Sequence, residues 1–547
     1  MPLSYNLKRD RDTKTFEHWN TLSSEHIEAT GLDRAALRRL QSAIQGRVVV
    51  PGQPDYDKDR KLANPLFDQH PQVIVYCEGA GNDVVTALQT AREFGLNVRS
   101  RSGGHSTAGY STGPGMLLDV SNMKSSPVFS PYGPTAPAAR VQPGCPFGNL
   151  NDSLDFYDLH VPGGGCPDVC VAGYMQGGGF GFTSRMFGMN CDRVFGVTMI
   201  TADGTVVRAD EKNNPDLFWA VRGGTGNQFG VLTEIDYQLV PVSKVWGFAL
   251  VWPLTSAAEI QQAANGLAVM QEQYMAGDAN GDIGYMTVIC GQSDGTPPQA
   301  DGSHLKPYLL MRGMIVGDAL QDGQSALEAR LAPLTATGAQ FQWTGFDTYN
   351  MMNYRLLAQP NEIPDFPAGT PMPMENKEAR YVGADTVLAV SDWVNLIKLV
   401  TQEAPNPYYC LVIEPYGGQI NKVGKMDTAF IHRDVACDIF LDGFWWQDQD
   451  RPAVDAWLGK FKAFMQPFWN GHVYQNYPSG DLTDYRWNYF GDAYPTLLKV
   501  KQKYDPAGLF DFPQSITPYP PNAGPEITVS KAKPLFQDSA HGDLPAE

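Results

Sequence analysis

Two hydrophobic periodicities follow each other in the segment 72–106. Val73–Cys77 is a short run of β-prone residues, and apolar side chains beyond the next Gly/Asn turn recur at helical spacing. Asn82 or Asp83 is the expected N-cap of this helix, and Gly95 is its expected end. A second short strand, 96–100, follows the helix. The pattern predicts a strand-helix-strand unit that leads directly into a glycine loop.

The pattern changes near residue 241. Before it, 194–208 predicts a hairpin around Asp203-Gly204, 216–220 a short helix and 229–240 a strand. Beyond it, alternating segments such as 411–414 and 438–441 suit an antiparallel sheet. A chain of 547 residues exceeds what one core usually organises. We therefore predict one domain formed by 1–240 and 471–517, a second domain inserted at 241–470, and a Pro-, Gly- and Ala-rich tail at 518–547.

Composition and charge exclude some classes of partner. Apolar residues make up 43% of the chain, and no apolar run is long enough to span a bilayer. The 41 basic and 59 acidic residues give a formal charge of −18, which opposes binding to nucleic acid or to an anionic membrane. The first eight residues lack the apolar core of a secretory signal, which favours a cytoplasmic location unless a leader was removed. The oligomeric state stays open.

Eight cysteines are spread from Cys77 to Cys437, unlike the dense framework of a small secreted scaffold. Cys166 and Cys170 form a CxxxC spacing without a second pair of ligands nearby. We therefore predict no metal site.

Two glycine-rich stretches, 101–106 and 163–181, are the strongest candidates for ligand binding. Glycine lets backbone N–H groups converge and lets an anion approach without a Cβ in the way, as in a loop that holds a pyrophosphate. For Gly103-Gly104 alone, an ordinary turn is the competing interpretation. The glycine density of 163–181 requires close approach to another segment or to a flat ligand.

Four motifs occur in a fixed order: Arg101–Ser106, Gly165–Val169 with Gly177–Gly181, Asp216–Gly224, and Tyr474–Tyr477 with 499–515. In this order they resemble the berberine bridge enzyme-like branch of the vanillyl-alcohol oxidase/PCMH flavoproteins. The resemblance covers nearly the whole chain. It implies an α+β fold, with a PCMH-type FAD-binding domain of two α/β subdomains. The inserted domain is then the substrate domain, built on an antiparallel sheet flanked by helices.

The resemblance implies FAD attached covalently at two points, through its 8α-methyl group to His105 and through C6 to Cys166. Taken alone, a loop histidine and an isolated cysteine would more often be a solvated residue and a buried apolar group. Two attachments raise the reduction potential of a flavin. The further cofactor-binding residues that the resemblance implies are Arg101, Ser102, Gly103, Gly104, Ser106, Gly165, Val169, Gly173, Gly178, Gly179, Gly181, Val231, Tyr474 and Asn476.

Hydride transfer from an alcohol to flavin N5 needs a base for the hydroxyl proton. The family pattern implies Tyr477 in that role, with Tyr474 as the second candidate, although spacing alone fits a core tyrosine equally well. Val169 stands where the family has a small residue on the oxygen side of the ring. The polar residue that plant members carry beyond the His-Arg pair falls on Ile439 here, or on Asp438 after a one-residue slip.

We therefore predict an oxidase that takes hydride from an alcohol or sugar hydroxyl of a small-molecule substrate and is reoxidised by O2, giving H2O2. A natural-product tailoring oxidase that forms a ring, C–C or C–O bond stays open, as does a flavin dehydrogenase with another acceptor. A binding protein would have no use for His105, Cys166 and Tyr477 together. A nicotinamide site is disfavoured, because Gly224-x-Gly226 is followed by Gly230, one residue too far.

Overall fold

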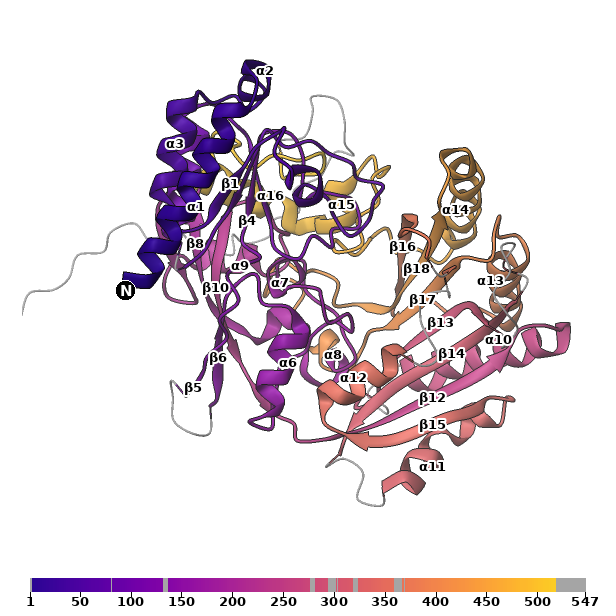
Figure 1. Cartoon of the computed structure of the whole chain (residues 1–547). Helices are drawn as coiled ribbons and strands as arrows, with labels where there is room; N and C mark the ends of the chain where they lie inside the picture. Colours follow the sequence, from indigo (N-terminus) through magenta and orange to yellow (C-terminus); the bar gives the residue numbers. More distant parts are fainter. Residues whose placement is uncertain are drawn as a thin grey trace, which may run out of the picture.

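The computed structural model describes residues 2–517, apart from 80, 131–135, 276–280, 294–301, 303, 318–322, 359–365 and 368. Figure 1 shows two parts side by side. One part joins the N-terminal elements to the C-terminal helices α15 (Tyr485–Phe490) and α16 (Tyr494–Tyr504), and the other is built on a seven-stranded sheet. The α+β fold predicted from the sequence is confirmed. The predicted tail, 518–547, lies outside the described residues.

The strand-helix-strand unit forms as predicted. It consists of β2 (Val73–Tyr76), α5 (Asn82–Glu93) and β3 (Val98–Arg101). Its sheet has the order β1-β2-β4-β3, in which β4 (Met116–Asp119) runs parallel to both neighbours and β1 (Arg47–Val49) is antiparallel. Gly95 follows the helix with φ +66°, a left-handed conformation that suits glycine.

The predicted cap of α5 is wrong. The N-cap is Gly81, and no side chain caps the helix. Asp83 is instead turned inward and is buried, and its carboxylate accepts hydrogen bonds from the backbone N–H groups of Gln45 (2.8 Å), Gly46 (2.8 Å) and Glu78 (3.0 Å). Asp83 thus does not cap its own helix. Its carboxylate instead connects, through hydrogen bonds, the segment before β1 with the turn before α5.

We expect Asp83→Ala to lower the free energy of unfolding by roughly 2–4 kcal/mol, because three N–H groups lose a charged acceptor at once. Asp33→Ala is the matched control. Among the described residues, the Asp33 side chain accepts a single hydrogen bond, from Ala36 N (2.6 Å) at the start of α3 (Arg34–Ala43), so its loss should cost about 1 kcal/mol. Calorimetric unfolding measures both variants, and equal losses would contradict the assignment.

A five-stranded antiparallel sheet follows, with the order β5-β6-β10-β8-β9. The predicted hairpin, helix and strand are confirmed as β8 with β9, α9 and β10. The bounds are β5 (Val128–Phe129), β6 (Ala138–Val141), β8 (Val194–Thr201), β9 (Val206–Ala209), α9 (Pro215–Val221), β10 (Gly230–Gln238) and β11 (Val240–Pro241).

The seven-stranded sheet is antiparallel throughout, with the order β15-β12-β14-β13-β17-β18-β16. The segments 411–414 and 438–441 lie in β17 and β18 of this antiparallel sheet, as predicted, and the structure shows that these two strands pair with each other. The strands are β12 (Val245–Pro253), β13 (Gly284–Ser293), β14 (Leu305–Val316), β15 (Gln340–Asp347), β16 (Met374–Gly383), β17 (Tyr409–Pro415) and β18 (Val435–Trp445).

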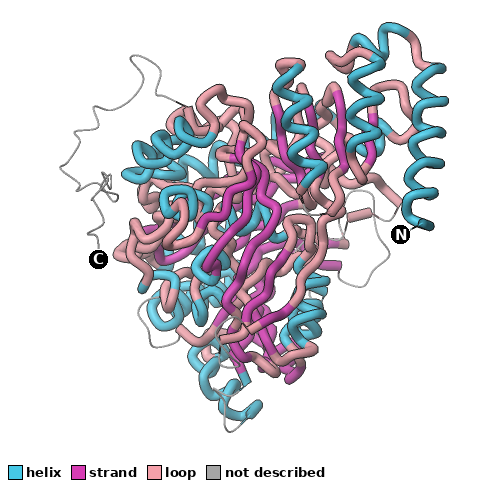
Figure 2. The backbone as a smooth tube through the Cα atoms, turned by 90° about the vertical axis from the view of Figure 1, so that its left-hand side faces the viewer, coloured by secondary structure: helices cyan, strands magenta, loops and turns pink. Residues whose placement is uncertain are grey.

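The two faces of this sheet have different neighbours. Four helices share a core with one face: α10 (Ala257–Met270), α11 (Gly323–Thr335), α13 (Val390–Gln402) and α14 (Arg451–Met465). The other face shares its core with the part formed by the N-terminal elements and the C-terminal helices. Figure 1 shows the long strands between these two layers, and Figure 2 shows the molecule from the side of the N-terminal elements. A cavity between the two parts therefore receives side chains from this second face of the sheet.

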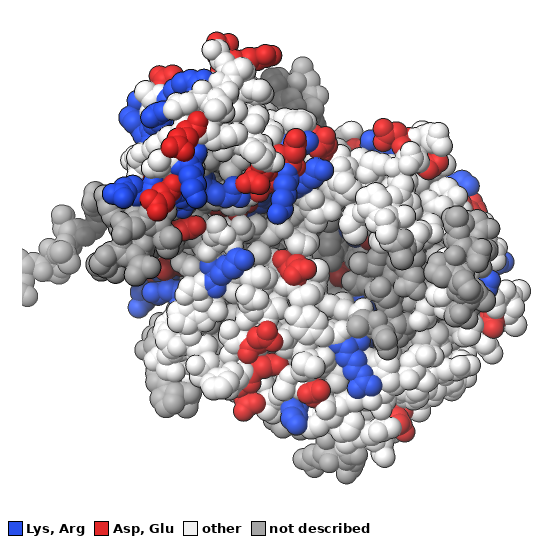
Figure 3. All heavy atoms as spheres, in the orientation of Figure 1, with Lys and Arg blue, Asp and Glu red and all other residues white. Residues whose placement is uncertain are grey.

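Further helices contact each other within one part or between the two parts. The helix α12 (Tyr349–Ala358) contacts α6 (Phe147–Asp155), and α16 contacts α9. The other elements are α1 (Pro2–Thr21), α2 (Ser24–Glu28), α4 (Tyr56–Asp59), β7 (Leu159–His160), α7 (Val171–Gln176) and α8 (Ser184–Phe187). Among the described residues, none of the helices combines the length and the apolar character needed to cross a membrane. Figure 3 shows basic and acidic side chains interspersed on one face of the molecule.

Candidate active site

A cavity of about 470 Å³ lies between the glycine loops and the seven-stranded sheet. Its walls come from the loop 100–107, from 164–176, from 474–478 and from strands β16 to β18. The structure brings most of the predicted site residues to these walls. They are Arg101, Ser102, Gly103, Gly104, His105, Ser106, Gly165, Cys166, Val169, Gly173, Val231, Tyr474, Asn476 and Tyr477.

The remaining three predicted cofactor-binding residues, Gly178, Gly179 and Gly181, do not line the cavity, and their close neighbours are other parts of the protein. A Cβ on Gly178 would lie 2.5 Å from the Phe430 ring, and one on Gly179 would lie 2.4 Å from the Tyr174 ring. A Cβ on Gly181 would lie 1.8 Å from the carbonyl oxygen of Gly163. These glycines are needed because other parts of the protein approach them closely.

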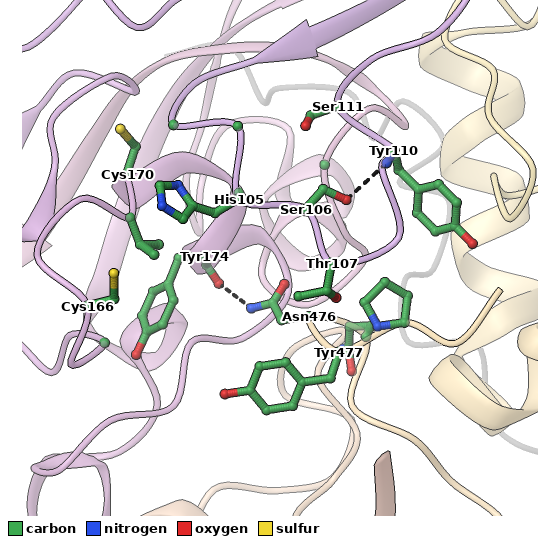
Figure 4. A pocket seen from close by; sticks show the side chains of 18 of the residues that line it. His105, Ser106, Thr107, Tyr110, Ser111, Cys166, Cys170, Tyr174, Asn476 and Tyr477 are labelled. Atoms are coloured by element: carbon green, nitrogen blue, oxygen red, sulfur yellow. Dashed lines mark hydrogen bonds between the residues drawn. The ribbon is translucent and has the colours of Figure 1, made fainter. Parts of the chain in front are cut away.

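His105 and Cys166 lie on the same side of the cavity (Figure 4). His105 follows Gly104, whose φ of +72° turns the loop. The surface that His105 exposes belongs to the cavity wall, so burial still lowers the pKa of the imidazole, which is neutral near pH 7. Cys166 is exposed, whereas Cys170 is buried and burial raises its pKa to about 12. Cys166 is thus the accessible sulfur of the pair.

Three unsatisfied hydroxyl groups show that the cavity suits a polar ligand. The side-chain oxygens of Thr107, Tyr110 and Ser111 are buried, line the cavity and have no hydrogen-bond partner within the described part of the chain. Such groups require a partner. Asn227 holds this loop, because its amide accepts from Ser100 N (2.6 Å) and donates to the carbonyl oxygen of Tyr110 (3.3 Å). The residues present therefore fit a bound FAD, whose ribityl and phosphate groups are polar.

The two candidate tyrosines are held differently. The hydroxyl oxygen of Tyr474 accepts from Gly179 N (2.9 Å) and Phe180 N (3.1 Å), so this side chain is tied to the glycine run. The hydroxyl of Tyr477 donates to Glu414 Oε1 (2.9 Å). Burial, and then Glu414, raise the pKa of Tyr477 well above its usual value. Of the two tyrosines, only Tyr477 has its hydroxyl hydrogen-bonded to an ionisable side chain, Glu414, which can exchange a proton with it.

Lys377 is the cation nearest to this tyrosine in the described cavity wall. Its Nζ lies 3.9 Å from the centroid of the Phe440 ring and 5.0 Å from that of Tyr477. It also forms an ion pair with Asp442 (2.6 Å). A cation over the ring favours the phenolate, which opposes the effect of burial.

Lys377, Glu414 and Asp442 were missed by the sequence analysis. They lie on three different strands, and only the pairing of those strands brings them together. The position predicted at Ile439 or Asp438 also needs correction. The Ile439 side chain lies on the helix-covered face of the sheet, away from the cavity. The acidic residue of β18 that lines the cavity is Asp442. Strand alternation from Asp438 was the available signal, since Asp438, Phe440 and Asp442 share one face.

Two family models match the chain, an FAD binding domain over residues 71–210 and a "Berberine and berberine like" domain over 473–517. The first match contains His105 and Cys166, and the second contains Tyr474 to Tyr477. By these two domains and their order the chain is similar to berberine bridge enzyme-like FAD-linked oxidases. The match to an FAD binding domain supports FAD as the cofactor.

Relatives of this chain match over most of its length. A carbohydrate oxidase of Microdochium nivale is 28% identical over 510 residues, which cover 89% of this chain and 95% of the relative. Berberine bridge enzyme-like 24 of Arabidopsis thaliana is 25% identical over 80% of this chain and 82% of its own. Physcomitrella patens BBE-like 1 superposes with a TM-score of 0.74 at 24% identity, over 88% and 99% of the two chains.

Proposed function

We propose that this chain carries FAD linked to both His105 and Cys166 and oxidises an alcohol or sugar hydroxyl, with O2 as the electron acceptor and H2O2 as a product. One observation carries the proposal. The hydroxyl of Tyr477, hydrogen-bonded to Glu414, lies in the same cavity as the imidazole of His105 and the thiol of Cys166. A base, a proton acceptor behind it and two attachment points thus share one enclosed space.

The chain's own residues account for attachment and orientation. Neutral His105 offers a ring nitrogen, and Cys166 offers an exposed sulfur on a different loop. Two attachments on separate loops would fix both the position and the tilt of a flat ring. When bound, the flavin supplies the group that accepts a hydride from the substrate.

Tyr477 would remove the substrate's hydroxyl proton. The tyrosine can pass its own proton to Glu414 at 2.9 Å, while Lys377 favours the negative charge that develops on the ring. The neighbouring Phe440, packed at 4.6 Å between centroids, keeps water away from this group. Proton removal and the loss of hydride can then occur in one closed site.

A saccharide is the proposed substrate class. The similarity to the carbohydrate oxidase supports it, and so does the mouth of the cavity. Phe366 packs there against Phe444 (5.1 Å) and Trp446 (5.6 Å). Such rings stack on the apolar faces of sugars, while Glu375 and Asp442 can accept hydrogen bonds from hydroxyl groups. Aromatic alcohols would use the same rings, so they form the competing class.

O2 is proposed as the acceptor because of Val169. This residue lines the cavity beside the two attachment points and is partly buried against the core. It leaves more room than the leucine that goes with poor oxygen use in this family. Peroxide release in air, compared with reduction of a dye under nitrogen, distinguishes an oxidase from a dehydrogenase.

The double linkage predicts that acid-precipitated protein gives a yellow pellet, since covalently held flavin cannot leave the chain. Mass analysis should find the flavin bridging the peptides with His105 and Cys166. His105→Ala and Cys166→Ala should each keep one link, and the double variant should release its flavin to the supernatant. Cys170→Ala is the control, because the Cys170 thiol is buried and should carry no flavin.

A screen for peroxide release tests the substrate class. Reducing oligosaccharides should give turnover, whereas aromatic and polyketide alcohols should give less. Turnover with the aromatic alcohols alone would favour the tailoring-oxidase alternative. A protein that stays colourless after addition of FAD would contradict the proposed function as a whole.

A further inference from the structure

Two carboxyl groups lie side by side behind Tyr477. Glu414 on β17 and Asp438 on β18 are directly paired across the two antiparallel strands. Residues in such a pair have Cβ atoms about 4.5–5.5 Å apart on the same face of the sheet. Glu414 is 2% exposed and Asp438 is 0% exposed. Bulk solvent hardly reaches either group, so each carboxyl acts strongly on the other.

Neither carboxyl is fully satisfied by the rest of the protein. Glu414 accepts one hydrogen bond, through Oε1 from Tyr477, whereas its Oε2 and both oxygens of Asp438 have no side-chain partner among the described residues. Leaving two carboxylates buried in that state would be very costly. A proton on the pair removes charge and supplies a donor, as in other paired buried carboxyls. The pair is therefore a place where the protein holds a proton.

The groups that face Asp438 set its charge. Lys377, Arg380 and Tyr381 come from β16, Glu414 comes from β17 and Tyr416 from just beyond it, and Tyr477 comes from the C-terminal part of the chain. Burial raises the pKa of Asp438 to about 7, against the opposing effect of Lys377 and Arg380. Burial, followed by Asp438, raises the pKa of Glu414 well above its usual value. Near neutral pH Glu414 therefore carries a proton, and Asp438 is protonated in only part of the molecules, so Asp438 can still accept one.

We propose that Asp438 is a positioning residue that stores the proton Tyr477 takes from the substrate. This rests on the proposed function. The C–H electron pair leaves the substrate as a hydride, and the O–H proton moves to Tyr477. Tyr477 passes its own proton to Glu414 Oε1, and Glu414 releases one from Oε2 to the carboxylate of Asp438. Asp438 ends as a carboxylic acid, and its proton is returned when O2, taking two electrons and two protons, becomes H2O2.

Asp438→Asn tests the store in the resting holoenzyme, because it keeps the size of the side chain and removes the titration. Infrared spectra across pH should show a carboxylic-acid C=O band that is lost as the pH rises through about 7, the pKa of Asp438, and that is absent in the variant. Asp434→Asn is the control, since that exposed carboxyl lies just before the same strand. A wild-type protein without such a band overturns the proposal, even if the variant does not fold.

Thermal unfolding gives a second readout. A carboxyl whose folded pKa is raised is more stable in the folded protein while protonated, so stability falls as pH rises between the unfolded value and about 7. Wild type should therefore lose more of its melting temperature over this window than Asp438→Asn. Identical pH dependence of the two proteins would contradict the proposal.

Proton release on anaerobic mixing with cellobiose at pH 8, followed with an indicator dye, separates this inference from the proposed function. A carboxyl with a pKa near 7 gives its proton up to solvent at pH 8, so the store should show as a delay. In wild type the release of about one proton per flavin should lag behind flavin reduction, whereas in Asp438→Asn it should accompany reduction. Asp438→Glu should restore the lag. If reduction needs Tyr477 but release is the same in all variants, only the proton store fails. If reduction does not need Tyr477, the proposed function fails as well.

Discussion

Tyr477→Phe should lower kcat/KM by roughly 10²–10⁴-fold, the usual contribution of a positioned general base. The corresponding loss of transition-state stabilisation is roughly 3–5 kcal/mol. The hydroxyl contacts Glu414 at 2.9 Å at the cavity wall, so its removal breaks the only path by which we expect the substrate proton to leave. Because that interaction develops as the proton moves, kcat should fall with kcat/KM while KM changes little. Anaerobic flavin reduction, followed by stopped-flow absorbance, measures the step directly.

A matched control is Tyr285→Phe. Tyr285 is a buried tyrosine of the same sheet, 1% exposed, but it packs in the helix-covered core. Its hydroxyl should be dispensable for turnover, so the variant should keep nearly full activity. Both variants should retain the yellow, acid-stable chromophore, since neither change touches His105 or Cys166. A Tyr477→Phe enzyme that reduces its flavin at the rate of the control would remove Tyr477 from the reaction.

Local patterns and motifs predicted a large part of this architecture. The unit β2-α5-β3, the β8–β9 hairpin and the presence of 411–414 and 438–441 in an antiparallel sheet follow from periodicity and turn residues close together in the sequence. The motifs around His105, Cys166 and Tyr477 also led to one cavity, although the three residues are far apart along the chain. Such motifs carry information about a shared ligand that periodicity alone does not contain.

The rest depends on long-range pairing, which a single sequence does not show. Lys377 is paired with Asp442, and Glu414 with Asp438, only because of the register of β16, β17 and β18. A shift of one residue would turn each of these side chains to the other face of the sheet. Asp83 likewise looked like a helix cap, because its partners around Gly46 are distant in sequence.

The glycine run shows the same limit in another form. The sequence indicated that 177–181 must meet something closely, but it left open whether this was a flat ligand or another segment. The structure gives different answers for neighbouring glycines. Gly173 lines the cavity and a Cβ there would meet no protein atom within 4 Å, whereas Gly181 faces a backbone carbonyl.

Gly181→Ala should therefore lower the free energy of unfolding by roughly 3–5 kcal/mol, although Gly181 does not line the cavity. The added Cβ would lie 1.8 Å from the carbonyl oxygen of Gly163, and a backbone atom cannot move aside as a flexible side chain can. The loop segment at Gly163 would have to shift, and it leads directly into Gly165 and Cys166. The link at Cys166 should thus be lost more readily than the link at His105.

Melting temperature and the mass of the flavin-bearing peptides measure these two effects separately. Gly459→Ala is the control, because this glycine lies inside α14 and a Cβ there meets nothing within 4 Å. That variant should gain up to about 1 kcal/mol, since alanine favours a helix more than glycine does. If Gly181→Ala instead melts like the wild type and keeps both links, the close approach of Gly163 to Gly181 is wrong. If it melts lower but keeps both links, the loop bearing Cys166 is positioned independently of this contact.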